Sequence, residues 1–290
     1  MELEVARIVI CFLVVITNMA VICMVVFIKE LRTFTNYFVL SLAVSDVLMG
    51  GVMLPLNHPW VPSSEVTGYV TMITMLSGVG NICAVTWDRY VAVMEPFTYR
   101  TKLKRYCRKF LFAIWMTSIS WSLLPLAWQT IPTYVYHKVY IIASMLAFVV
   151  LPYVGVCIAY IRIFVILRSH MAQLKRGITS ASERQGARRT SLEGKTVKVF
   201  VVVVVIFLLS WVPVIYMSTV FTVLQRPDLI PRYFPNINNL VLGVLSLVNP
   251  VLYAFMKRDF NRQIRRLKNN SVHHSFRLSV GLSTERYQVN

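Results

Sequence analysis

Residues 81–93 read NICAVTWDRYVAV, an apolar run that carries two adjacent opposite charges, Asp88 and Arg89. Charged side chains in a lipid-facing helix are costly, so we ask which partners or which position in the fold stabilise this pair. Hydrophobic residues make up 57% of the 290-residue chain and charged residues only 14%. A soluble domain usually carries about 25% charged residues. The chain therefore has too little polar surface to cover itself in water, and the sequence predicts a membrane protein.

Seven apolar runs are long enough to cross a bilayer, which takes about 20 helical residues. One of them, KVFVVVVVIFLL at 198–209, would form a buried strand in water. In lipid it must be helical, because an open strand edge leaves backbone groups unsatisfied. We therefore predict an all-α bundle of seven transmembrane helices over 1–256, followed by an amphipathic helix and a disordered tail over 257–290. The predicted spans lie near 6–28, 36–56, 64–93, 109–128, 139–167, 196–224 and 236–256.

The basic residues are unevenly distributed between the two faces of this predicted bundle. Most of the 30 lysines and arginines fall on one face, and the exceptions are Arg7, Lys138, Arg226 and Arg232. Short basic loops stay in the cytoplasm, so we expect the N-terminus outside and the C-terminus inside. The net charge of +18 is then expected to meet anionic lipid and an acidic protein partner rather than nucleic acid.

Two further features concern the cytoplasmic side and the cysteines. The segment KRDFNRQIRRLKNN at 257–270 places Phe260, Ile264 and Leu267 on one helical face, as in a helix that lies on the membrane surface.

The five cysteines lie in the apolar helices or near the cytoplasmic face. We therefore expect no disulfide bond.

Each predicted span also carries a landmark residue or motif. These are Asn18, SLAVSD with Asp46, DRY at 88–90, Trp115, Pro152 with Tyr160, FLLSWVP at 207–213 and NPVLY at 249–253. With these landmarks in register, the chain resembles rhodopsin-like (class A) G-protein-coupled receptors over nearly its whole length, in an amine, adenosine or melanocortin-like branch. The resemblance implies a plasma-membrane receptor, not an enzyme, that passes an extracellular ligand signal to a heterotrimeric G protein. Arrestin and a receptor kinase are further implied partners.

The resemblance implies a signalling switch in the inner half of the bundle. It pairs Arg89 with Glu193 in the resting state, although Glu193 is equally explained as a solvated charge or as a partner of Lys195 or Lys198. Phe207 and Trp211 fit either a repacking switch below the ligand or simple core packing. The full implied set is Asp88, Arg89, Tyr90, Tyr160, Glu193, Phe207, Trp211, Pro213, Asn249, Pro250 and Tyr253. Pro213 and Pro250 each remove a helix hydrogen bond and bend their helices.

Asp46 is a carboxylate in the middle of a predicted span, where insertion costs about 2.5–3.5 kcal/mol. One interpretation is a side chain that is merely hydrogen-bonded between helices. The resemblance implies instead a polar pocket that can hold a sodium ion, formed with Asn18, Ser246 and Asn249. The third-span position that usually offers a serine here is Gly78, with Ser77 beside it, which weakens the sodium prediction.

The inner loop after the DRY motif is a candidate contact for the G protein. Arg89, Pro96 and Phe97 are the implied contact residues, and an exposed phenylalanine on a basic loop is typical of an interaction site. The alternative is that Phe97 folds back onto lipid. The stretch RRTSLE at 188–193 places two arginines before Ser191, a pattern typical of kinase substrates, so Ser191 is a candidate phosphorylation site.

Several family features are replaced in this chain. Thr71 stands where monoamine receptors carry an aspartate, and Gly243 where opsins carry the retinal lysine. Ser64 stands where most members have the disulfide cysteine. The alignment implies a ligand pocket that is largely apolar, without formal charge, for a small neutral, lipid-like or short peptide ligand. Its implied lining is Thr71, Met72, Met75, Ser144, Trp211, Ser218 and Asn239.

The alternative function is a seven-helix channel or secondary transporter. Such a protein needs a continuous polar pathway. Away from the ends of the predicted spans Asp46 is the only charged residue, and Asp88 and Arg89 lie near one end, so no charge relay is visible. The sequence therefore favours a receptor.

Overall fold

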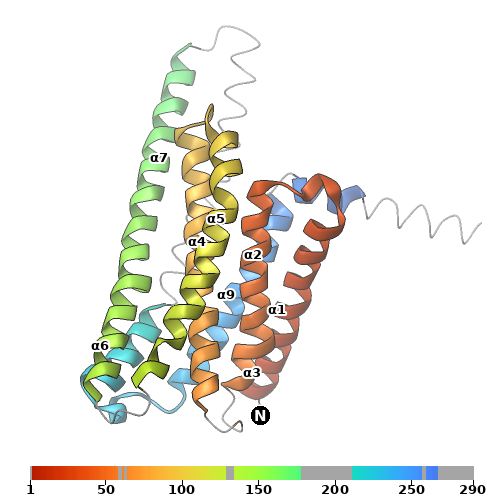
Figure 1. Cartoon of the computed structure of the whole chain (residues 1–290). Coiled ribbons are helices and arrows are strands. Elements are labelled where there is room, and N and C mark those ends of the chain that lie inside the picture. The colour runs from red at the N-terminus through yellow and green to blue at the C-terminus, as the bar shows by residue number, and fades with distance from the viewer. Residues whose placement is uncertain are drawn as a thin grey trace, which may run out of the picture.

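The computed structural model describes residues 2–57, 61, 64–128, 134–177, 211–256 and 259–266. The described chain is almost entirely helical, and the spans run alternately up and down in one bundle, with α6 and α7 continuous in a single span (Figure 1). The long elements are α1 (Glu2–Phe27), α2 (Phe34–Leu48), α4 (Glu65–Met94), α5 (Tyr99–Leu123), α6 (Tyr134–Met145), α7 (Leu151–Gly177) and α9 (Phe234–Met256). Short elements extend or connect the helices: η1 (Lys29–Leu31), η2 (Met49–Met53), α3 (Leu54–Leu56), η3 (Leu124–Trp128), η4 (Leu146–Val150), η5 (Thr219–Val223) and η6 (Pro227–Leu229).

Length and composition identify the described helices as membrane-spanning. Five continuous helices, together with their short extensions, are long and apolar enough to cross a bilayer, and Trp211–Val223 is a shorter apolar helix. Large apolar side chains such as Phe12, Phe112 and Leu151 are exposed on the outside of the bundle, as lipid contact requires. The predicted all-α membrane bundle is therefore confirmed. Two helices extend beyond the predicted spans, because α5 begins at Tyr99 instead of near residue 109 and α7 ends at Gly177 instead of near residue 167.

Neighbouring helices in the bundle are fixed by close contacts. α1 packs on α2 and α9, α4 packs on α2, α5 and α7, and α2 also touches α5. α1 and α9 run in the same direction, because Gly243 lies against Ile10 while the next turn of α9 meets Asn18. This pairing of the first and last helices closes the bundle.

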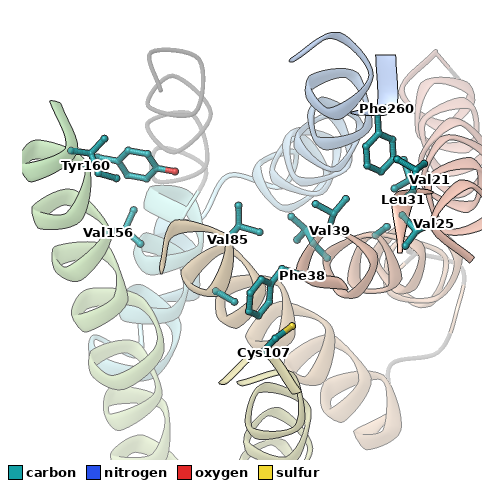
Figure 2. Close-up of a cluster of buried hydrophobic side chains, with 14 residues drawn as sticks. Val21, Val25, Leu31, Phe38, Val39, Val85, Cys107, Val156, Tyr160 and Phe260 are labelled. Carbon is teal, nitrogen blue, oxygen red and sulfur yellow. The ribbon is translucent and has the colours of Figure 1, made fainter. Parts of the chain in front are cut away.

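The largest buried cluster lies at the end of the bundle that carries Arg89. Figure 2 shows Val21 and Leu31, Phe38 and Val39 of α2, Val85 of α4 and Tyr160 of α7 within this cluster. We call this end the Arg89 end. The opposite end is called the cavity end.

The short helix at 259–266 belongs to the Arg89 end, where its Phe260 is only 1% exposed and packs in the same cluster as Val21, Val25 and Leu31 (Figure 2). Gln263 is buried as well, whereas Ile264 is 37% exposed. Phe260 therefore anchors this helix to the bundle, while the apolar face predicted to lie on the membrane surface remains a prediction. Leu267 lies outside the described residues.

Helix ends are capped by polar side chains in places that the sequence does not single out. Thr33 accepts a hydrogen bond from the backbone N–H of Asn36 at the start of α2. Ser64 accepts the N–H of Thr67 at the start of α4. Such N-caps satisfy backbone donors that a helix cannot pair internally. All five cysteines lie in the described part and carry free thiols.

Candidate functional site: a ligand cavity, a polar layer and an arginine latch

The Arg89 end holds a buried hydrogen-bond network centred on Asp88, whose side chain is only 1% exposed. Arg89 Nη2 lies 3.0 Å from one carboxylate oxygen, Oδ2. The other oxygen, Oδ1, accepts hydrogen bonds from the Tyr99 hydroxyl at 2.7 Å and from the Thr35 hydroxyl at 3.2 Å. Thr35 and Tyr99 also lie 2.7 Å apart. Asp88 of α4 therefore holds the guanidinium, and Thr35 of α2 and Tyr99 of α5 hold Asp88 in turn.

Sequence reasoning did not find Thr35 or the role of Tyr99. Thr35 lies 53 residues from Asp88, and no local pattern marks it as a partner. Tyr99 is the first residue of α5, and its hydroxyl turns back to Asp88. Tyr90, which follows Arg89 and belongs to the predicted switch, accepts a hydrogen bond from Arg162 of α7 at 3.4 Å.

The loop between α4 and α5 is held by local polar contacts and exposes one aromatic side chain. Glu95 accepts hydrogen bonds from Lys102 at 2.6 Å and from Thr98 at 2.8 Å. These two bonds hold the pKa of Glu95 below its usual value. Phe97 is fully exposed beside the exposed Pro96. The loop is therefore ordered by its own contacts while Phe97 packs on no described part of the bundle.

A polar layer crosses the middle of the bundle around Asp46, which is 6% exposed. Asn249 donates its Nδ2 hydrogen to Asp46 Oδ2 at 2.8 Å. Asn18 donates to the Ser246 carbonyl at 3.2 Å, so it links α1 to α9. A cavity of about 50 Å³ lies here, and its lining includes Asp46, Ser246, Asn249 and Gly78. The four residues predicted for the pocket are thus brought into one layer.

The same layer extends towards α5 through residues that were not predicted as a site. Asn81 of α4 donates to Ser45 Oγ at 2.7 Å and to the Ser41 carbonyl at 3.3 Å. Ser41 Oγ in turn accepts the indole N–H of Trp115 at 3.0 Å. These bonds tie α2, α4 and α5 together. Trp115 is one of the landmark residues in the sequence, but only the folded chain shows that its hydrogen-bond partner is Ser41.

The cavity end holds a cavity of about 530 Å³. It is lined by all seven residues predicted for the ligand pocket, namely Thr71, Met72, Met75, Ser144, Trp211, Ser218 and Asn239. The lining also includes Arg232, just before α9, and Asn236 and Asn238 in the first two turns of α9, none of which was predicted from the sequence. The expectation of a lining without formal charge is therefore wrong, since Arg232 adds a cation.

Two predicted lining residues are more constrained than their residue types suggest. Ser144 donates its hydroxyl hydrogen to the Tyr140 carbonyl at 2.7 Å and accepts the indole N–H of Trp121 at 2.8 Å. Its donor capacity is used within the protein. Trp211 is 6% exposed and lines both the large cavity and the Asp46 cavity, so it forms a shared wall between them.

The structure leaves several predicted residues untested. Ser191, Glu193 and Phe207 lie outside the described residues, as do Lys195 and Lys198. Pro213 lies in the helix at Trp211–Val223, and Pro250 lies inside α9. For Tyr253 only its place in α9 is described. Gly243 packs tightly, because a Cβ atom there would lie 2.6 Å from Ile10 Cγ2, so the position has no room for a lysine.

The bundle, the outer cavity, the central polar layer and the buried arginine network together define a seven-helix membrane receptor. Residues 17–253 match the family model described as 7 transmembrane receptor (rhodopsin family). The chain belongs to this family, which confirms the resemblance drawn from the landmark residues.

Similar proteins include named receptors from several animals. The alpha-1D adrenergic receptor of Sus scrofa is 26% identical over 90% of this chain and 55% of its own length. The histamine H2 receptor of Cavia porcellus is 28% identical over 93% of this chain and 82% of its own. Melanopsin-B of Xenopus laevis is 20% identical over 82% of this chain and 49% of its own. The chain thus spans only about half the length of several relatives it matches.

Proposed function

We propose that this chain is a G-protein-coupled receptor of the plasma membrane, with the cavity end outside and the Arg89 end in the cytoplasm. A ligand in the outer cavity shifts the balance between two helix packings, and a heterotrimeric G protein reads the change at the Arg89 end. The observation that carries this proposal is the position of Trp211, which lines the cavity and also the polar layer beneath it. A ligand that moves the Trp211 side chain therefore also moves a wall of the Asp46 cavity.

The basic loops at the Arg89 end support this orientation. Further partners fit the same end. The exposed Arg262, Arg265 and Arg266 of the 259–266 helix favour anionic lipid headgroups. Arrestin and a receptor kinase are proposed as later partners, with Ser191 as a candidate phosphate acceptor.

The proposal is tested by nucleotide exchange on G proteins. The purified chain in lipid nanodiscs, added to a panel of heterotrimers, is expected to accelerate exchange on at least one of them. Ion flux through proteoliposomes without exchange on any heterotrimer would favour a channel or transporter and would overturn the proposal.

Phe97→Ala is expected to reduce this exchange about tenfold or more, because an exposed aromatic anchor contributes a large share of interface energy. Phe112→Ala is the matched control, since Phe112 is 68% exposed on α5 within a membrane-spanning segment. An equal loss in both variants, or none in Phe97→Ala, would contradict the contact assigned to Phe97.

The Asp46 cavity is proposed to hold water and to bind sodium only weakly. A hard cation needs several oxygen ligands. Asp46 supplies a carboxylate, but Asn249 already donates a hydrogen bond to it, and Ser77 is not among the residues that line the cavity. Gly78 offers no side-chain oxygen. The described residues therefore do not complete the shell of a sodium ion, whereas a polar space of about 50 Å³ suits water.

Gly78→Ser is expected to create a sodium-dependent stability that the natural chain lacks. A Cβ atom at position 78 meets nothing within 4 Å, so serine fits without displacing a neighbour. The melting temperature of this variant should rise by several degrees when sodium chloride replaces choline chloride, because a ligand bound by the folded state stabilises it. Gly78→Ala controls for the helix itself. A large sodium effect in the natural chain would show that the proposed weakness is wrong.

A further inference from the structure

We infer that the cavity accepts an apolar molecule with an anionic end, and that Arg232 binds this end at the mouth of the cavity. The inference rests on the proposed function, in which the cavity takes the extracellular ligand. It concerns the chemical class of that ligand, for which relatives named after dopamine and histamine suggest protonated amines.

The charge of the lining disfavours a cation. Arg232 is the only charged residue among the described residues that line the cavity. No Asp or Glu contributes to this lining, and position 71 is a threonine. The loop segments 58–60, 62–63 and 129–133 contain no Asp or Glu either. A protonated amine would therefore lose its hydration without gaining a carboxylate partner.

Arg232 is exposed, whereas its neighbour Arg226 is already paired. Asp228 receives hydrogen bonds from Arg226 at 2.7, 2.9 and 3.1 Å, and this pairing holds the pKa of Asp228 below its usual value. Within the described residues no carboxylate lies within ion-pair distance of Arg232. Its guanidinium, with five N–H donors in a planar fork, is suited to a carboxylate or phosphate.

The polar groups deeper in the cavity also include a donor for a ligand. Asn57 gives its amide hydrogens to the Met53 carbonyl and to Thr71 Oγ1, both at 2.9 Å. Thr71 accepts this bond, so its own hydroxyl hydrogen is left to donate, and no described residue accepts it. Ser144 cannot compete, because its hydrogen is bound to the Tyr140 carbonyl. A ligand acceptor atom near Thr71 therefore has a donor in place.

The remaining wall suits a flexible apolar body. Met72, Met75, Met145 and Met217 line it together with Trp211. Methionine side chains are unbranched and polarizable, so they adapt to ligands of different shape. A cavity of about 530 Å³ lies within the usual range for small-molecule sites. Methionine-rich walls with interspersed uncharged amides and hydroxyls, and a single cation at the rim, match an amphiphile whose charged end stays near water.

The experiment compares four probes that share one apolar body: 4-phenylbutyrate, the phosphate ester of 4-phenylbutanol, 4-phenylbutanamide and 4-phenylbutylamine. Their affinities for the full chain in neutral nanodiscs are measured from probe-dependent shifts in melting temperature. We expect either anion to bind at least tenfold more tightly than the amide, and the amine to bind most weakly. The ranking of carboxylate against phosphate identifies which anion the site prefers.

Arg232→Gln is expected to remove the preference for the anion over the amide, and Arg226→Gln is expected to keep it. Both arginines are exposed, so neither change disturbs the packing. Tightest binding by the amine, binding by none of the four probes, or an unchanged preference in Arg232→Gln would overturn the inference. Failure of the receptor proposal is separate, because it would appear as absent nucleotide exchange while the Arg232-dependent preference persists.

Discussion

Tyr99→Phe is expected to raise basal nucleotide exchange about tenfold. The Tyr99 hydroxyl donates at 2.7 Å to Asp88, whose side chain is 1% exposed, and it also lies 2.7 Å from the Thr35 hydroxyl. A hydrogen bond to a charged group contributes about 1.5–3 kcal/mol. Without it, Asp88 holds Arg89 less firmly in the packing that this structure shows. If that packing is the resting one, the balance moves towards the form that engages the G protein.

The matched control for this prediction is Tyr106→Phe on the same helix. The Tyr106 ring packs against Trp87 and Phe110, and no hydrogen bond joins its hydroxyl to a described residue. Thr35→Val should raise basal exchange in the same direction by a smaller factor, because its bond to Asp88 is longer, at 3.2 Å. Basal exchange that stays unchanged in Tyr99→Phe at normal expression would show that the network serves folding alone.

Gly50→Ala is expected to destabilise the folded bundle by about 1–3 kcal/mol, the usual cost of overpacking. A Cβ atom at position 50 would lie 2.6 Å from Val14 Cγ1 and 3.2 Å from the Cys11 carbonyl oxygen. The second contact is with the backbone of α1, which cannot turn aside as a side chain can. Membrane helices that approach this closely depend on small residues at the contact. The measurement is the thermal unfolding of purified protein.

Gly155→Ala is the control for this loss of stability. It also lies inside a helix, but a Cβ atom there meets nothing within 4 Å. Because alanine favours a helix over glycine by about 1 kcal/mol, this variant should be unchanged or slightly more stable. Equal melting temperatures for Gly50→Ala and the natural chain would mean that α1 and η2 can separate without cost.

Much of the architecture could be predicted from the sequence because membrane helices follow a simple physical rule. A run of about 20 apolar residues has to span the bilayer and has to be helical, so composition and length fix the number and type of elements. The landmark motifs then indicate the rhodopsin-like receptor family. The residues aligned to the ligand pocket do line one cavity in the structure, since the order of helices around the bundle fixes which faces meet.

Boundaries and partners were harder to predict. α5 begins at Tyr99, ten residues earlier than hydropathy indicates, because its basic first turns lie beyond the apolar run that marks a span. The burial of Phe260 depends on a pocket between distant residues, Val21 and Leu31 among them. Periodicity within one helix shows which residues share a face, but not which of them finds a partner.

The sequence by itself determined that this chain is a bundle of membrane helices with an Asp–Arg pair at one end of the third span. It also determined that Thr71, an uncharged residue, lies towards the other end of that span. Only the tertiary structure decided which hydroxyl groups donate to Asp88 and that the Ser144 hydroxyl is already bonded to the Tyr140 carbonyl. It also decided that Arg232 lines the cavity. The physical reason is range. A membrane span can be predicted from the hydropathy of consecutive residues. A hydrogen bond such as that from Thr35 to Asp88 joins groups 53 residues apart and forms only when α2 and α4 pack together.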